Sequence, residues 1–144
     1  MRKVLFIVLM LCSISICGKT EPQYAFTVVT GSELNDTLRQ PLNDLVGYIK
    51  KVIRKSDVKV VERVDEEMPA GNIILFSDER LEGFNAFSIS SRDRKDGATG
   101  VVYELRGSDI MGCQYAIYDL AKRLLGVRYL KPELDYAPEK SDFA

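Results

Sequence analysis

The stretch from Gly97 to Pro132 constrains the fold of this chain more than any other segment. Its sequence predicts a strand over Ala98–Arg106, a glycine-containing turn, an amphipathic helix, a glycine stop at Gly126 and a short strand over Val127–Leu130. The helix is indicated by apolar residues at spacings of three, four and seven, namely Ile110, Cys113, Ile117, Leu120, Ala121 and Leu124. A helix with one apolar face needs a second layer to cover that face, so the chain is expected to fold as a layered domain.

The ends of this helix carry strong local signals. Ser108 or Asp109 can accept hydrogen bonds from the free N–H groups of the first turn, and Gly126 suits the left-handed residue that follows a helix end. Gly112 permits another backbone to approach the helix closely. Asp96 and Gly97 lie between two strand-like segments and predict a hairpin.

The preceding segments supply the rest of the fold. A second helical stripe runs from Leu38 to Ile53, and Pro41 predicts that this helix starts near Gln40 with the proline in its first turn, either directly or after a separate short helical piece. Strands are predicted at Tyr24–Thr30, Asp57–Val64, Asn72–Ser77 and Phe84–Arg92. The continuous apolar run Asn72–Ser77 is typical of a strand buried on both faces. The order β-α-β-β-β-β-α-β predicts an α+β domain of two layers, in which both helices pack on one face of a mixed sheet.

Composition excludes several kinds of chemistry. The length of 144 residues fits one domain. The formal net charge of −1 gives no reason to expect nucleic acid as a partner. It contains no histidine, so Ser-His-Asp and Cys-His catalysis and imidazole metal sites are excluded. Cys113 is the single cysteine outside the N-terminal segment, and no disulfide framework, metal site or cofactor site is predicted.

Residues 1–18 have the pattern of a cleaved export signal. Arg2 and Lys3 precede the apolar run Val4–Leu11, and small residues follow. As a helix, the longer segment Val4–Ile16 would span about 20 Å, short of the roughly 30 Å hydrocarbon core of a bilayer. The expected location is therefore the periplasm or cell envelope. An alternative interpretation is that Cys17 carries a lipid, which would tether the protein to a membrane without spanning it.

Several short motifs resemble a known module. They are Asn72-Ile-Ile-Leu-Phe, Phe84-Asn-Ala-Phe-Ser-Ile89, Gly107-Ser-Asp109, Gly112-Cys-Gln-Tyr-Ala-Ile-Tyr-Asp-Leu120 and Leu125-Gly-Val-Arg-Tyr-Leu-Lys-Pro132. Their order over 24–138 is similar to the N-terminal, non-catalytic domain of α-glucuronidases and family 20 β-N-acetylhexosaminidases, in particular of secreted Bacteroidetes-type relatives. The resemblance implies that the catalytic carboxylates belong to a barrel following this domain. From its composition, Glu133–Ala144 is predicted to be a polar tail, of which residues 139–144 lie beyond the domain as a tail or the start of a linker.

Candidate site residues are few. Glu79, Glu82, Glu104 and Asp109 are the carboxylates considered as a glycosidase pair, but Asp109 is better explained as a helix cap and the others as solvated residues. Cys113 is predicted to be a core residue.

The residues considered for contact with a glycan or a partner are Tyr115, Tyr118, Arg128 and Tyr129. No catalytic residue is predicted, and whether the whole protein is an enzyme stays open. The resemblance, together with the absence of catalytic residue types, implies an accessory domain of an exported carbohydrate-active protein that packs on a catalytic barrel in cis or in trans. The alternative is a stand-alone envelope module that binds glycan or protein.

Overall fold

The computed structural model describes residues 24–31, 36–63, 68–77, 79–131 and 134–138. The predicted export segment 1–18, its Cys17 and the tail 139–144 lie outside the described residues. The elements, in chain order, are β1 (Tyr24–Val29), α1 (Asp36–Val52), β2 (Ser56–Val61), β3 (Asn72–Phe76), β4 (Phe87–Asp93), β5 (Val101–Gly107), α2 (Ile110–Leu125), β6 (Arg128–Lys131) and β7 (Leu134–Tyr136).

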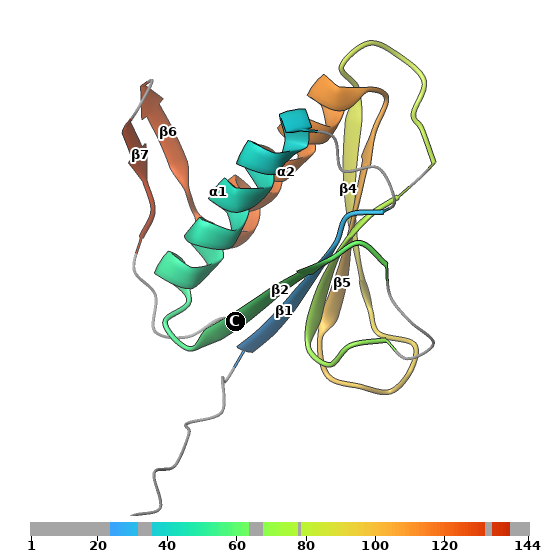
Figure 1. The fold of residues 1–144 in the computed structure, drawn as a ribbon, viewed down its shortest axis with the longest axis vertical. Helices are drawn as coiled ribbons and strands as arrows, with labels where there is room; N and C mark the ends of the chain where they lie inside the picture. The colour runs from blue at the N-terminus through green and yellow to red at the C-terminus, as the bar shows by residue number, and fades with distance from the viewer. Residues whose placement is uncertain (1–23, 32–35, 64–67, 78, 132–133, 139–144) are drawn as a thin grey trace, which may run out of the picture.

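The first five strands form one mixed sheet with both helices on one face (Figure 1). The strand order is β2-β1-β3-β5-β4, in which β4 is antiparallel to β5 and the other neighbours are parallel. The helices pack against each other as well as against the sheet. The predicted α+β class, with a mixed sheet and a single helical layer, is therefore confirmed.

The core lies between the sheet and the helices because alternate strand residues point toward that layer. Phe26 and Val28 of β1 pack there with Leu45 and Ile49 of α1. The opposite face of the sheet also buries Ile73, since its strand β3 is central and is flanked by β1 and β5. Asn72, Ile73 and Ile74 are buried and Leu75 and Phe76 are partly buried, so the prediction that this apolar run is buried on both faces is confirmed for its first three residues.

The prediction that the first helix starts near Gln40 was wrong. α1 begins at Asp36, and Pro41 lies inside it with its ring buried. A proline has no N–H for the carbonyl four residues earlier, which here belongs to Thr37. The side-chain amide of Gln114 on α2 donates to that carbonyl at 3.3 Å. The neighbouring helix thus provides the donor for the Thr37 carbonyl that Pro41 cannot provide.

The C-terminal segment also differs from the prediction. Residues after Glu133 were expected to be a polar tail, but Leu134–Tyr136 forms β7 and pairs with β6. This two-stranded hairpin is separate from the main sheet and lies beside the helices, on their far side from it (Figure 1). The observed order therefore has one strand more than predicted. Tyr129 faces Asp135 across the hairpin.

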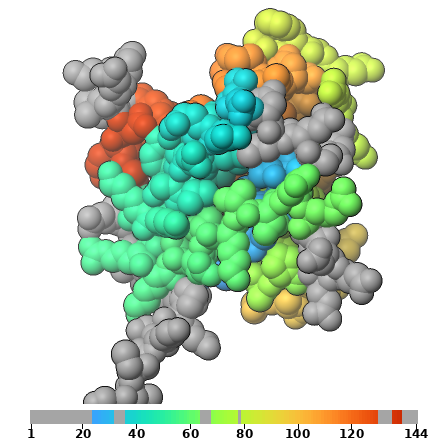
Figure 2. Space-filling model, viewed as in Figure 1, coloured from blue at the N-terminus to red at the C-terminus, as the bar shows by residue number. Residues whose placement is uncertain are grey.

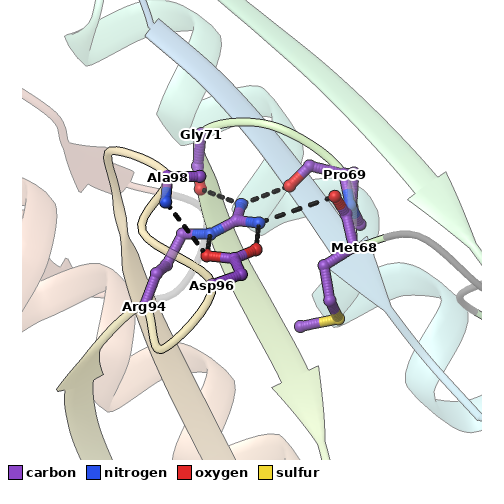
Figure 3. Close-up of polar contacts among 6 residues, drawn as sticks. All are labelled: Met68, Pro69, Gly71, Arg94, Asp96 and Ala98. Atoms are coloured by element: carbon purple, nitrogen blue, oxygen red, sulfur yellow. Dashed lines mark hydrogen bonds and ion pairs between the residues drawn. The ribbon is translucent and has the colours of Figure 1, made fainter.

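The turn between β4 and β5 is tied to the loop before β3 by Arg94 (Figure 3). Its guanidinium donates to the carbonyls of Met68, Pro69 and Gly71 and pairs with the carboxylate of Asp96. The hairpin itself was predicted, but β5 begins at Val101 rather than Ala98 because the chain first forms this connection. The Arg94 guanidinium lowers the pKa of Asp96 to about 2.

Candidate docking surface

Hydrogen bonds of Ser108 and Asp109 join the start of α2 to the loop before β4. One oxygen of the Asp109 carboxylate accepts from the Gly112 N–H at 2.7 Å, and the other accepts from the Asn85 N–H at 2.9 Å. The Ser108 hydroxyl accepts from the Ala86 N–H, and the Ser108 N–H donates to the Ala86 carbonyl, both at 2.9 Å. We call these five residues the helix-start clamp. The predicted role of Asp109 as a helix cap is confirmed.

The Gly107–Gly112 motif is explained by the closeness of this contact. A Cβ atom at position 112 would lie 2.3 Å from the Ala86 carbonyl oxygen, and one at position 107 would lie 2.5 Å from the Cys113 nitrogen. The two backbone N–H groups that Asp109 holds, from Gly112 and Asn85, lower the pKa of its carboxyl group because they stabilise the charged form. The motif therefore encodes a rigid connection between loop and helix.

The helix-start clamp presents a set of exposed apolar side chains, which we call the apolar rim. Its members are Phe84, Phe87, Ile110, Met111 and Tyr115. Phe84 is 88% exposed, and Asn85 beside it has a positive φ of 51°. The rings of Phe87 and Tyr115 lie 6.4 Å apart. Figure 2 shows the loop before β4, in yellow-green, projecting beside the start of α2, in orange.

Two predictions about this region were wrong. Phe84 was placed on a strand, but β4 begins at Phe87 and leaves Phe84 on the loop. Ile110 was placed on the buried stripe of the helix, but it is 42% exposed. It lies at the first position of α2.

A hollow of about 990 Å³ lies next to the apolar rim, where the parallel strands β1, β3 and β5 end. Its lining includes Phe84, Met111, Arg80 and Cys113. Cys113 is partly buried rather than a full core residue. Its burial, with the nearby charge of Asp109, raises the pKa of the thiol. Arg80 is exposed and forms no ion pair within the described part of the chain.

The other predicted carboxylates lie elsewhere. Arg106 on β5 forms ion pairs with Glu79 at 2.6 Å and with Glu104 at 2.7 Å, so it offsets both charges. Glu82 is exposed on the loop before β4. Among the described residues, no group of three or more Cys, Asp or Glu side chains is arranged to hold a metal ion.

A second surface feature is a group that we call the tyrosine cluster, consisting of Tyr48, Tyr118 and Tyr129 with Asp44 and Asp135. The Tyr129 ring lies 5.3 Å from that of Tyr118 and 6.3 Å from that of Tyr48, both edge to face. The Tyr118 hydroxyl donates to Asp44 at 3.0 Å, and the Tyr48 hydroxyl donates to Asp135. These contacts join α1, α2 and the β6–β7 hairpin.

The structure brings only two of the predicted contact residues together. Tyr118 and Tyr129 meet in the tyrosine cluster, whereas Tyr115 belongs to the apolar rim and Arg128 is exposed on β6. Sequence reasoning missed Tyr48, Asp44 and Asp135. The spacing of four between Asp44 and Tyr48 puts both on one helix face and was the available signal. Asp135 lay in the segment predicted as a tail.

The tyrosine hydroxyls of the tyrosine cluster should lose their protons at higher pH than ordinary tyrosines as long as the protein is folded. The pKa of Tyr118 is raised to about 12 by burial, by the hydrogen bond to Asp44 and by the charges of both carboxylates. The pKa values of Tyr48 and Tyr129 are raised as well, by burial and by the same two carboxylates. A raised folded pKa stabilises the fold fully below pH ~10, and this contribution is lost as the pH rises through the folded value.

Alkaline titration of phenolate absorbance measures this directly, because the chain contains no tryptophan. A Tyr118→Phe variant should lose one late-titrating group and keep the others. Titration of every tyrosine near its ordinary pKa, before the protein unfolds, would contradict the arrangement.

Comparisons with known proteins found no match to this chain among family models, curated proteins or solved structures. In the part of the chain that the structure describes, no helix has the length and apolar character needed to cross a membrane.

Proposed function

We propose that this chain is a non-catalytic accessory domain of an exported carbohydrate-active protein and that it packs on a catalytic barrel in cis or in trans. The apolar rim is the observation that carries the proposal. Five large apolar side chains gather around one helix start, and exposed apolar patches of this kind mark protein interaction sites. The class of partner comes from the sequence resemblance to glycoside-hydrolase N-terminal domains.

The rigidity of the apolar rim supports a docking role. The hydrogen bonds of Asp109 and Ser108 hold the backbone of the loop that carries Phe84, so little backbone conformational entropy is lost when a partner covers this side chain. The adjoining hollow gives a protruding group of the partner a place to enter, and the exposed Arg80 at its edge can meet a carboxylate there. Apolar contact surrounded by polar groups is the usual composition of a protein interface.

The test begins with the reading frame downstream of this chain, which we expect to encode a glycoside-hydrolase barrel. Calorimetric titration of that barrel with this chain should give a one-to-one complex. Phe84→Ser should weaken the complex by about 30-fold, the loss typical of a buried aromatic at an interface centre. Val60→Ser is the matched control, since Val60 is 49% exposed on the edge strand β2 and should leave affinity unchanged.

Three results would contradict the proposal. The first is equal loss of affinity in the Phe84 and Val60 variants, and the second is the absence of a complex with the barrel. The third is hydrolysis of aryl glycosides by this chain alone that a single carboxylate substitution abolishes.

The alternative function, a stand-alone envelope module that binds glycan or protein, is favoured by one specific observation. Tyr118 and Tyr129, predicted as contact residues, lie together in the tyrosine cluster with carboxylates beside them. Aromatic rings flanked by hydrogen-bonding groups are common in carbohydrate sites and in protein interfaces.

A further inference from the structure

The tyrosine cluster holds two negative charges that no cation balances within the described residues. Asp44 accepts from the Gln40 amide at 2.8 Å and from Tyr118, and Asp135 accepts from Tyr48. All of these donors are neutral, so they satisfy hydrogen bonds and leave the charges in place. A carboxylate has about four acceptor positions, and neither of these two is saturated.

The rings around these carboxylates are placed to contact a cation. Tyr129 is 42% exposed and lies between Tyr48 and Tyr118, with Asp44 and Asp135 bonded to the two outer rings. A cation over a tyrosine face is attracted by the ring quadrupole, and the nearby carboxylates add to this attraction. Figure 1 shows that α1, α2 and the β6–β7 hairpin, which carry these residues, lie next to one another.

We propose that the tyrosine cluster is a docking site for an arginine-bearing segment of a partner protein. A guanidinium group stacks on aromatic rings and donates to carboxylates in a fixed fork, so one side chain uses both features of the site. A neutral glycan would leave the two charges unbalanced, and the edge-to-face rings do not form a flat platform for a sugar. Two carboxylates are also too few for a calcium ion, which takes six to eight oxygen ligands.

This site is separate from the apolar rim, and the inference does not rest on the proposed function. The two surfaces share no residue, since the rim takes Ile110, Met111 and Tyr115 from α2, whereas the cluster takes Tyr118 together with residues of α1 and the β6–β7 hairpin. A partner can therefore be gained or lost at one surface with no change at the other, and the two tests fail independently.

The probe is a blocked tri-arginine peptide, titrated into the full chain and followed by NMR of the tyrosine rings. We expect saturable shifts at Tyr48, Tyr118 and Tyr129 that weaken as salt rises. The matched tri-citrulline peptide, which has the same shape without the charge, should cause none. Asp44→Asn should weaken binding by at least about fivefold, whereas Asp57→Asn, an exposed aspartate on β2, should not.

Three outcomes would overturn the inference. They are the absence of saturable shifts, equal binding of the citrulline peptide, and saturable binding of a neutral oligosaccharide at the same rings. The last result would instead support the glycan-binding alternative. Because Asp135→Asn also removes a bond that holds the hairpin, Asp44→Asn is the deciding variant, with an unchanged amide spectrum of β6 and β7 as its folding control.

Discussion

A Gly112→Ala substitution is expected to destabilise the domain, whereas Gly47→Ala on the other helix is expected to stabilise it. Both glycines are inside helices, where alanine is intrinsically favoured by about 1 kcal/mol. At position 47 nothing lies within 4 Å of the added Cβ atom, so that gain should be realised. At position 112 the Cβ atom would lie 2.3 Å from the Ala86 carbonyl oxygen, which is backbone held by Ser108.

The cost at position 112 comes from separating the loop from the helix. Overpacking of this kind costs about 1–3 kcal/mol, and here it also weakens the hydrogen bonds from Asn85 and Ala86. We expect the two alanine variants to differ in unfolding free energy by about 2–4 kcal/mol, measured by denaturant titration. Equal stabilisation by both substitutions would show that the helix-start clamp has no energetic importance.

The elements that the sequence predicted best are those with purely local causes. The start of α2 follows from an aspartate that can accept N–H groups, and its end follows from Gly126, which adopts a φ of 69°. The central strand follows from a continuous apolar run that only a position between two strands can bury. In these cases the residue type and the neighbouring pattern contain the whole explanation.

The elements that were missed depend on contacts between distant parts of the chain. Pro41 is tolerated inside α1 because Gln114, more than seventy residues away, donates to the carbonyl that the proline leaves free. Leu134–Tyr136 has too little apolar character to predict a strand, but it is held by pairing with β6 and by the Tyr48–Asp135 hydrogen bond. Propensity is overridden by tertiary structure in both cases.

The candidate surfaces divide in the same way. Gly107 and Gly112 can be recognised in the sequence, but the reason for Gly112 is its close contact with the Ala86 carbonyl, which only the fold shows. Tyr118 and Tyr129 were identified as contact residues, whereas Tyr48 and the two aspartates were not. An aromatic side chain can be recognised as a candidate contact residue from the sequence alone. Which rings and charges meet is a property of the fold.

Arg94→Met is expected to have a large effect on stability, although the residue lies in a turn. Its side chain is only 2% exposed, and its guanidinium donates to the carbonyls of Met68, Pro69 and Gly71. Methionine keeps much of the apolar stem but leaves these carbonyls without a donor and breaks the pair with Asp96. The loss of several charged hydrogen bonds in this partly buried turn predicts a destabilisation of about 2–4 kcal/mol.

Arg92→Met is the matched control, because Arg92 lies two residues earlier, is exposed on β4 and makes no ion pair within the described residues. It should change the unfolding free energy by less than about 0.5 kcal/mol.

The pH dependence gives an independent check. The folded pKa of Asp96 is depressed to about 2, so the stabilisation from its pairing with Arg94 is present above pH ~4 and is lost as the pH falls toward that value. The difference between wild type and Arg94→Met should therefore shrink in acid, while the Arg92→Met difference stays constant. A difference independent of pH would mean that Asp96 contributes nothing and that the backbone carbonyls alone make Arg94 important.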